Sequence, residues 1–187
     1  NKNANNFAKT TIDVNFYETQ KHFQELLPEH GYILDFGCGS GRDTKYFLEQ
    51  GFYVDATDGS KEMCHIASNY TGIQVRRLLF EELDENKKYD GIWACSSILH
   101  LPKNELKAVF MKMLKALKED GIIYTSFKYG DFEGERNGRY FTDFTEKTFE
   151  EFVGEIDNLQ LKEEWITGDV RPGRGEEKWL NVILQKN

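Results

Sequence analysis

The sequence lacks any long apolar run. No window approaches the roughly 18 consecutive apolar residues that a membrane-spanning helix needs. The first six residues, Asn-Lys-Asn-Ala-Asn-Asn, also lack the apolar core of a signal peptide. We therefore expect a soluble cytoplasmic protein that does not act at a membrane.

Cysteine is scarce as well. The chain has three cysteines, Cys38, Cys64 and Cys95, which are an odd number and lie 26 and 31 residues apart. Disulfide frameworks need paired cysteines, and zinc sites place their ligands at short, regular spacings. The pattern fits neither, so we expect no structural metal.

The chain also lacks a surplus of positive charge. The chain carries 24 Lys and Arg against 32 Asp and Glu, which gives a net charge of −8. Nucleic-acid-binding proteins usually present a basic face, because the phosphate backbone repels an acidic one. We expect no nucleic-acid partner and favour a small-molecule substrate, with the protein acting as a monomer or a homodimer.

The length and the 39% of apolar residues suit one globular domain with a buried core. No internal repeat or interdomain linker divides it. We expect a single domain over 1–187, in which 1–30 form a helical arm or lid and 31–187 form the core. Phe16, Phe23, Leu26 and Leu27 are spaced to suit a helix that lies on that core.

Short apolar runs alternate with helical patterns along most of the chain. Strands are predicted at 32–36, 52–58, 73–78, 89–95 and 122–127. Helices are predicted over 42–50, after a Ser60 cap, and through the apolar positions from Leu106 to Leu117, ending near Gly121. Such alternation predicts an α/β fold with a parallel sheet and right-handed crossovers.

The C-terminal third of the pattern is different. Residues 128–144 are rich in Gly, Arg and aromatic residues and are predicted as a loop, after which Thr145 caps a helix. Strands follow at 159–167 and 178–186. The ten residues between them are too few for a crossover helix, so this pair is predicted to be antiparallel.

Three glycines at alternate positions, Gly37, Gly39 and Gly41, link the first strand to the first helix of the core. Such a turn lets backbone approach a ligand closely and aims helix N–H groups at it, although a plain tight turn is the structural alternative. A phosphate-binding Walker loop would need Lys-Ser/Thr where Arg42-Asp43 stand, and the third glycine comes one residue early for a dinucleotide fingerprint.

The pattern Asp-x-Gly-x-Gly-x-Gly at 35–41, with Asp58 ending the second strand, resembles the cofactor signature of class I S-adenosylmethionine-dependent methyltransferases. An acid at this distance suits a ribose diol, whose two hydroxyls a carboxylate can accept together. The resemblance covers nearly the whole chain. It implies a Rossmann-like, seven-stranded, mostly parallel sheet of order 3-2-1-4-5-7-6, whose last strand in the chain is antiparallel, with helices on both faces.

Other segments look like a bacterial subgroup of small-molecule methyltransferases related to the tellurite-resistance type. They are 37–44, 92–97, 126–130 and 169–174. The resemblance implies that the chain binds S-adenosylmethionine and releases S-adenosylhomocysteine. The implied cofactor-binding residues are Asp35, Gly37, Cys38, Gly39, Ser40, Gly41, Arg42, Asp58, Gly59, Ser60, Leu79, Phe80, Glu81, Cys95 and Ser96.

Methyl transfer needs alignment, exclusion of water and, for a weak nucleophile, removal of a proton. His100 is a candidate general base, with a packed structural histidine as the alternative, and Tyr17 is a second catalytic candidate. Cys95 is interpreted as a wall of the pocket.

Ligands of open α/β sheets lie beyond the carboxyl ends of the strands. Segments 128–144 and 169–179 and the arm around Phe7, Thr11 and Tyr17 should meet there. The predicted substrate-binding residues are Lys128, Arg139, Tyr140, Arg171, Arg174 and Trp179, with Arg136 nearby. The cations either recognise an anionic acceptor or pair with the acids of the same loops. A non-catalytic sensor or scaffold that binds S-adenosylmethionine is the alternative to an enzyme.

Overall fold

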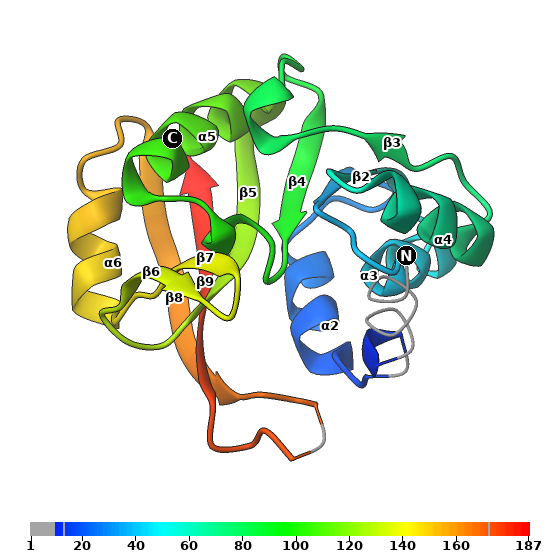
Figure 1. Cartoon of the computed structure of the whole chain (residues 1–187). Coiled ribbons are helices and arrows are strands. Elements are labelled where there is room, and N and C mark those ends of the chain that lie inside the picture. The colour runs from blue at the N-terminus through cyan, green and yellow to red at the C-terminus, as the bar shows by residue number, and fades with distance from the viewer. Residues whose placement is uncertain (1–9, 13, 172) are drawn as a thin grey trace.

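The computed structural model describes residues 10–12, 14–171 and 173–187 (Figure 1). The helices are α2 (Tyr17–Glu25), α3 (Arg42–Glu49), α4 (Lys61–Thr71), α5 (Lys103–Ala116) and α6 (Glu146–Val153), with short 3-10 helices η1 (Phe80–Glu82) and η2 (Ile98–His100). The strands are β1 (Tyr32–Phe36), β2 (Tyr53–Asp58), β3 (Arg76–Arg77), β4 (Tyr89–Ala94), β5 (Leu117–Lys128), β6 (Glu133–Arg136), β7 (Arg139–Thr142), β8 (Leu159–Gly168) and β9 (Lys178–Lys186).

One seven-stranded sheet organises the molecule. Its order is β3-β2-β1-β4-β5-β9-β8, where the first five strands are parallel and β9 is antiparallel to both of its neighbours. The predicted fold and strand order are therefore confirmed. The two C-terminal strands carry the numbers 8 and 9 because a separate hairpin, β6-β7, precedes them.

Helices cover both faces of this sheet. Helices α5 and α6 lie on one side and α2, α3 and α4 on the other (Figure 1). The larger core packs Phe110 of α5 and Phe149 of α6 against the sheet, and the smaller one packs Phe23 of α2 around Trp93 of β4. Trp93 stacks on Tyr124 of β5 at 4.1 Å between ring centroids. These layers leave the carboxyl ends of the parallel strands accessible.

Two predicted boundaries differ from the structure. The third strand is only Arg76–Arg77, because Ile73 and Val75 pack beneath α4 and the N–H of Val75 donates to the Ser68 hydroxyl. Helix α5 ends at Ala116, well before Gly121, because the backbone is already extended from Leu117 and pairs there with Tyr89.

The segment predicted as a loop after β5 contains a hairpin. Strands β6 and β7 pair through the two-residue turn Asn137-Gly138, whose φ angles of 53° and 75° are both positive. Asn-Gly is the favoured residue pair for such a turn, because the turn needs a positive φ at both positions. The backbone twist of this turn matches the twist of the two strands that it joins. In the part of the chain that the structure describes, no helix is long and apolar enough to cross a membrane.

Candidate cofactor and acceptor site

A cavity of about 820 Å³ lies at the carboxyl edge of the parallel strands. Most of the residues predicted from sequence line it: Gly37, Cys38, Gly39, Ser40, Arg42, Asp58, Gly59, Ser60, Phe80, Cys95, Ser96, His100, Lys128, Arg139, Arg171, Arg174 and Trp179. The others are outside its wall: Asp35, Gly41, Leu79, Glu81, Tyr140 and Tyr17.

The glycine turn forms one wall by close packing. A Cβ atom on Gly37 would lie 2.5 Å from the Cβ of Ser97, so no side chain fits there. The N–H groups of Gly37 and Cys38 both donate to the carbonyl of Thr57, and that of Gly41 donates to the Cys38 carbonyl. These N–H groups serve the protein itself, so the turn offers a ligand close approach rather than hydrogen-bond donors.

Asp58 joins the end of β2 to this turn. One carboxylate oxygen accepts from the N–H of Gly39 at 3.0 Å and the other from the N–H of Ser60 at 2.9 Å. These two bonds pair the carboxylate within the protein even when no ligand is bound. Burial raises the pKa of Asp58 against the effect of both bonds. Each oxygen keeps a further lone pair for a ligand hydroxyl.

The predicted cofactor-binding residues at 79–81 lie only partly as expected. Phe80 of η1 lines the cavity and packs edge-on against Phe36 at 4.9 Å, whereas Leu79 and Glu81 are outside the wall. The carboxylate of Glu82 caps its own turn by accepting from the N–H of Leu79. Glu62, in the first turn of α4, lines the cavity instead, and only its place soon after Asp58 could have indicated it.

A buried polar cluster adjoins the glycine turn. Asp43 is bound by a two-point ion pair with Arg42, and also accepts from Gln20 of α2 and from the indole N–H of Trp93. Arg42 holds the pKa of Asp43 below its usual range in spite of burial. Asp35 lies beside this pair, 2% exposed, and accepts a hydrogen bond from Thr44.

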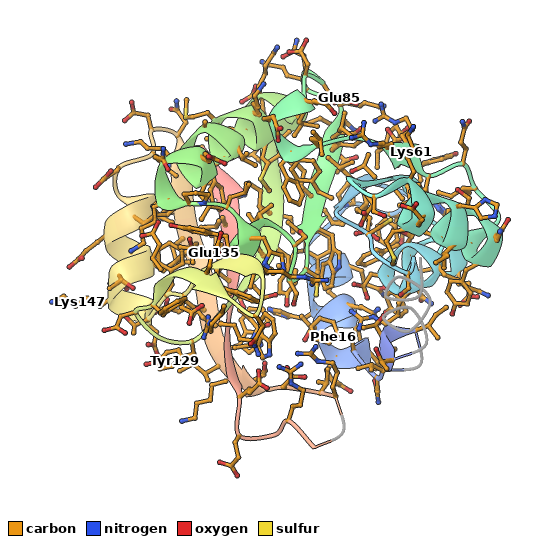
Figure 2. All side chains as sticks on the ribbon, in the orientation of Figure 1. Phe16, Lys61, Glu85, Tyr129, Glu135 and Lys147 are labelled. Atoms are coloured by element: carbon orange, nitrogen blue, oxygen red, sulfur yellow. The ribbon has the colours of Figure 1, made fainter. Side chains whose placement is uncertain are left out.

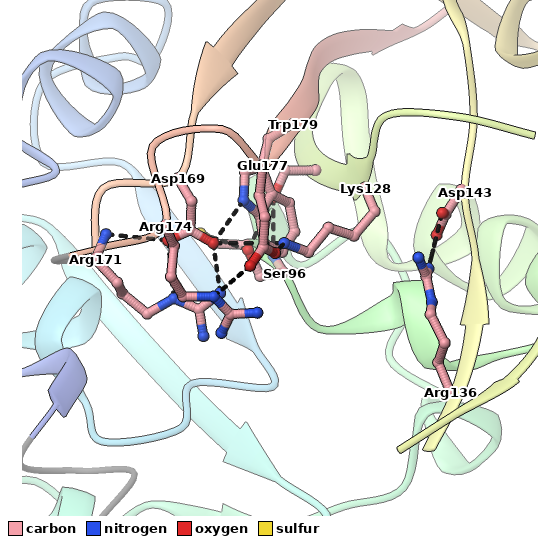
Figure 3. A network of polar contacts seen from close by, with 11 residues as sticks. Ser96, Lys128, Arg136, Asp143, Asp169, Arg171, Arg174, Glu177 and Trp179 are labelled. Carbon is pink, nitrogen blue, oxygen red and sulfur yellow. Dashed lines mark hydrogen bonds and ion pairs between the residues drawn. The ribbon is translucent and has the colours of Figure 1, made fainter. Parts of the chain in front are cut away.

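The opposite wall carries an ion-pair network (Figure 3). Asp169, only 2% exposed in its side chain, accepts from Arg171 and from the indole N–H of Trp179 at 3.1 Å. Lys128 contacts both Asp169 and Glu177. The hydrogen bonds from Arg171 in particular hold the pKa of Asp169 far below its usual range in spite of burial.

Arg174 completes this network through an ion pair with Glu177 at 2.5 Å. Arg136 pairs with Asp143 at 2.6 Å, apart from the network and outside the cavity wall (Figure 3). Most of the predicted anion-binding cations therefore hold loops together, which is the alternative that the sequence left open.

Arg139 is the exception. It lines the cavity from β7, and within residues 10–12, 14–171 and 173–187 it forms no ion pair. Phe141 lines the cavity from the same strand, while the Tyr140 side chain between them turns away and its hydroxyl donates to Glu133. Alternate residues of a strand face opposite sides, which corrects the placement predicted for Tyr140.

His100 is held by the Tyr140 backbone. Its Nδ1 lies 2.8 Å from the Tyr140 carbonyl, which can only accept, so Nδ1 carries the proton and neutral His100 has its lone pair on Nε2. Burial, together with the charge of Arg139, lowers the pKa of His100. The ring packs edge-on against Phe141. His100 is thus a neutral base at the cavity wall.

Small side chains, most of them polar, form the floor of the cavity between the two walls. Ser96 follows β4 with a positive φ of 50°, and its N–H donates to the Ser126 hydroxyl at 2.9 Å. Burial raises the pKa of Cys95 to about 12, so its thiol stays protonated and serves as wall rather than as a nucleophile.

Thr11 and Phe16, from the segment before α2, line the remaining side of the cavity. Phe16, labelled in Figure 2, lies just before α2 and lines the cavity. The guanidinium of Arg42 lies 4.8 Å from the centroid of the Phe16 ring. Thr11 donates to the Ser40 hydroxyl. Tyr17 is outside the cavity, 48% exposed, and packs edge-on against Tyr46. Phe7 is outside the described residues.

This combination, a Rossmann-like sheet with a glycine turn and a β2 acid at its carboxyl edge, defines a class of domains that bind nucleoside cofactors. Residues 33–121 match a family model described as a methyltransferase domain. The chain has the fold of the class I S-adenosylmethionine-dependent methyltransferases, and the matched segment contains the glycine turn and Asp58.

Proteins of similar sequence also carry methyltransferase names. The chain is 31% identical over 122 residues to YqeM of Bacillus subtilis (strain 168), a methyltransferase by name, over 59% of this chain and 49% of that protein. It is 25% identical over 151 residues to an uncharacterized methyltransferase of Staphylococcus carnosus (strain TM300), over 74% of this chain and 73% of that one. The chain thus spans about half the length of the first of these relatives.

Among solved structures, the chain resembles the 1,6-didemethyltoxoflavin-N1-methyltransferase of Burkholderia thailandensis, solved with 1,6-didemethyltoxoflavin and S-adenosylhomocysteine. The TM-score is 0.74 at 25% identity, over 91% of this chain and 77% of that one. A TehB-like methyltransferase of Corynebacterium glutamicum has a TM-score of 0.73 at 19% identity, over 100% of this chain and 99% of that one. The second likeness shows the fold alone, so the tellurite-resistance subgroup stays a prediction.

The residues present fit S-adenosylmethionine as the cofactor. The cavity volume is in the range of small-molecule and cofactor sites, about 300–1,000 Å³. Gly37 brings bare backbone to the cavity wall, and Asp58 lines the same cavity with carboxylate oxygens that can each accept a further hydrogen bond from a ribose hydroxyl. Phe80 offers an apolar surface at the same end.

Proposed function

We propose that this protein transfers a methyl group from S-adenosylmethionine to a small-molecule acceptor. One observation carries the proposal: a single cavity joins the glycine turn and Asp58 on one wall to the cationic, hairpin-bearing wall opposite. In the proposed arrangement Asp58 accepts from the ribose hydroxyls, Phe80 contacts the adenine, and Cys95 and Ser96 lie beneath the sulfonium. That sulfonium supplies an activated methyl group.

The acceptor would occupy the half of the cavity lined by Lys128, His100, Arg139 and Trp179. We propose that Arg139 binds an anionic group of the acceptor, because it is the cation of this wall that no acid of the described chain neutralises. A guanidinium binds carboxylate or phosphate through two parallel hydrogen bonds. Arg171 and Arg174 would shape the site through Asp169 and Glu177 and would not bind the anion directly.

His100 is proposed as the general base for an acceptor that must lose a proton. Its Nδ1–H is committed to the Tyr140 carbonyl, which leaves Nε2 as the basic atom, and its lowered pKa keeps that atom deprotonated near neutral pH. Residues 1–30 are proposed to act as a lid over the acceptor, an idea supported by the contacts of Thr11 and Phe16 with the glycine-turn wall of the cavity.

The relative solved with 1,6-didemethyltoxoflavin supports a small molecule as the class of acceptor. The experiment is calorimetric titration with S-adenosylmethionine, followed by a search for S-adenosylhomocysteine release from a pool of cytoplasmic metabolites. Binding followed by acceptor-dependent release is expected. Binding without release from any pool would favour the sensor or scaffold alternative and contradict the proposal.

A further inference from the structure

Asp35 is a buried acid that forms no ion pair with any residue that the structure describes. It ends β1 immediately before the glycine turn, and its side chain is shielded from solvent, with the residue 2% exposed. Its one hydrogen-bond partner in the described parts of the chain is the Thr44 hydroxyl, 2.5 Å away. A hydroxyl satisfies hydrogen bonding but carries no charge, so it cannot compensate an ionised carboxylate.

The charges around Asp35 do not balance it. Asp43 is its acidic neighbour, and the only cation of this cluster, Arg42, is already bound to Asp43 at two points. Asp58 from β2 adds a further negative charge nearby, while the Cys38 and Cys95 thiols of the same wall stay neutral because their pKa values are raised. An ionised Asp35 would therefore leave one uncompensated negative charge in the protein interior.

A buried carboxyl in this situation keeps its proton instead of its charge. Burial, and then the charge of Asp43, raise the pKa of Asp35. This preference would reverse when a cation binds beside the cluster. Gly37, two residues further on, lines the cavity, so a ligand on the glycine turn lies close to the end of β1.

We propose that Asp35 carries a proton in the free protein and releases it when the positively charged cofactor binds. The inference rests on the proposed function. S-adenosylmethionine carries a sulfonium, an ammonium and a carboxylate, hence a net positive charge, and supplies the counter-charge that the cluster lacks. S-adenosylhomocysteine has a neutral thioether in place of the sulfonium and therefore supplies less positive charge to the cluster.

Two consequences follow from linkage. Because binding releases a proton, the apparent association constant for S-adenosylmethionine rises with pH until Asp35 is ionised in the free protein as well. The apparent association constant for S-adenosylhomocysteine rises less steeply with pH. Asp35 would thus increase the preference for the charged cofactor over its neutral product as the pH rises, which helps the product to leave.

The test is isothermal titration of the full chain with S-adenosylmethionine between pH 6.5 and 8.5, in pairs of buffers that differ in ionisation enthalpy. The cofactor's own α-amino group titrates near this range, at roughly 8. The measured quantity is therefore the difference in released protons between wild type and Asp35→Asn. The matched control is Glu62→Gln, an acid on the same cavity that is exposed to solvent and already ionised.

Wild type is expected to release about half a proton to one proton more per bound cofactor than Asp35→Asn, and Glu62→Gln is expected to release as much as wild type. Equal release by wild type and Asp35→Asn overturns the inference while leaving the proposed function intact. Failure of wild type to bind the cofactor at all overturns both.

Asp35→Asn could fold poorly, so a second measurement uses only wild type. The infrared difference spectrum between the cofactor-bound and free protein should show loss of a protonated carboxylic acid band. A spectrum with no such loss in the same pH range contradicts the inference. The same experiment with S-adenosylhomocysteine should give a smaller loss, and an equal loss would remove the role assigned to the sulfonium.

Discussion

Asp58→Ala is the sharpest perturbation of the proposed cofactor site. The variant removes the carboxylate that would accept from the ribose hydroxyls. One hydrogen bond to a charged group contributes about 1.5–3 kcal/mol, so the loss of even one should lower affinity for S-adenosylhomocysteine about 10- to 150-fold. Calorimetry at constant pH measures this loss directly.

The same change also acts on the protein. Without Asp58, the N–H groups of Gly39 and Ser60 lose the acceptors that lie 3.0 and 2.9 Å away. Both groups lie beside the cavity, where water can replace part of the loss, so we expect a fall of about 1–3 kcal/mol in the free energy of unfolding.

Asp58→Asn separates the two effects, because its single amide oxygen can keep one backbone bond but cannot reproduce the charge. It should melt closer to wild type than Asp58→Ala and still bind the cofactor weakly. A loss of affinity below about twofold in the alanine variant, with the fold intact, would refute the role given to Asp58.

Three further predictions test other parts of the site. Gly39→Val should abolish cofactor binding while circular dichroism stays native, because φ at this position is +55° and valine disfavours it; unchanged affinity would reject the placement of the cofactor on this turn. Once an acceptor is known, Arg139→Ala should raise its KM and leave cofactor affinity nearly constant, whereas Arg136→Ala should change melting temperature and not KM; the reverse pattern would contradict the anion site. Asp169→Asn should lower the melting temperature at pH 7, and this difference should shrink below about pH 4, because a carboxyl with a lowered pKa contributes stability above its unfolded pKa that is lost as the pH falls. The same difference at both pH values would show that charge at Asp169 does not hold the loop.

The fold could be predicted because its signals are local and repeated. The apolar run 32–36, its glycine turn and the stripe of α5 each depend on neighbouring residues, and the order of the sheet then follows from the family resemblance. The end of α5 could not be predicted in this way, because pairing of Leu117 with Tyr89 is a tertiary contact.

The β6-β7 hairpin was not predicted, although a local signal for it is present in the sequence. Asn137-Gly138 indicates a two-residue turn in the sequence itself, but the surrounding Gly, Arg and aromatic residues favour a loop. Without the hairpin, the alternation along β7 cannot be assigned. That alternation is what turns Arg139 toward the cavity and Tyr140 away from it.

The ion pairs of the acceptor wall depend on geometry that sequence does not contain. Arg139 and Arg171 are both arginines in loops or strands near the same edge, and composition treats them alike. Only the folded chain shows that Arg171 is bound to Asp169, while Arg139 faces the cavity without an acid partner in the described residues.

The most direct test of the proposed function follows the methyl group itself. The protein is incubated with S-adenosylmethionine labelled in its methyl carbon and with the small-molecule fraction of a bacterial extract. A parallel reaction uses the unfractionated extract, and Asp58→Ala serves as control in both. We predict that label enters a small molecule, that S-adenosylhomocysteine forms in equal amount, and that both fall in the control. Cofactor binding without S-adenosylhomocysteine formation, or label found only in protein or nucleic acid from the unfractionated extract, would contradict a small-molecule methyltransferase.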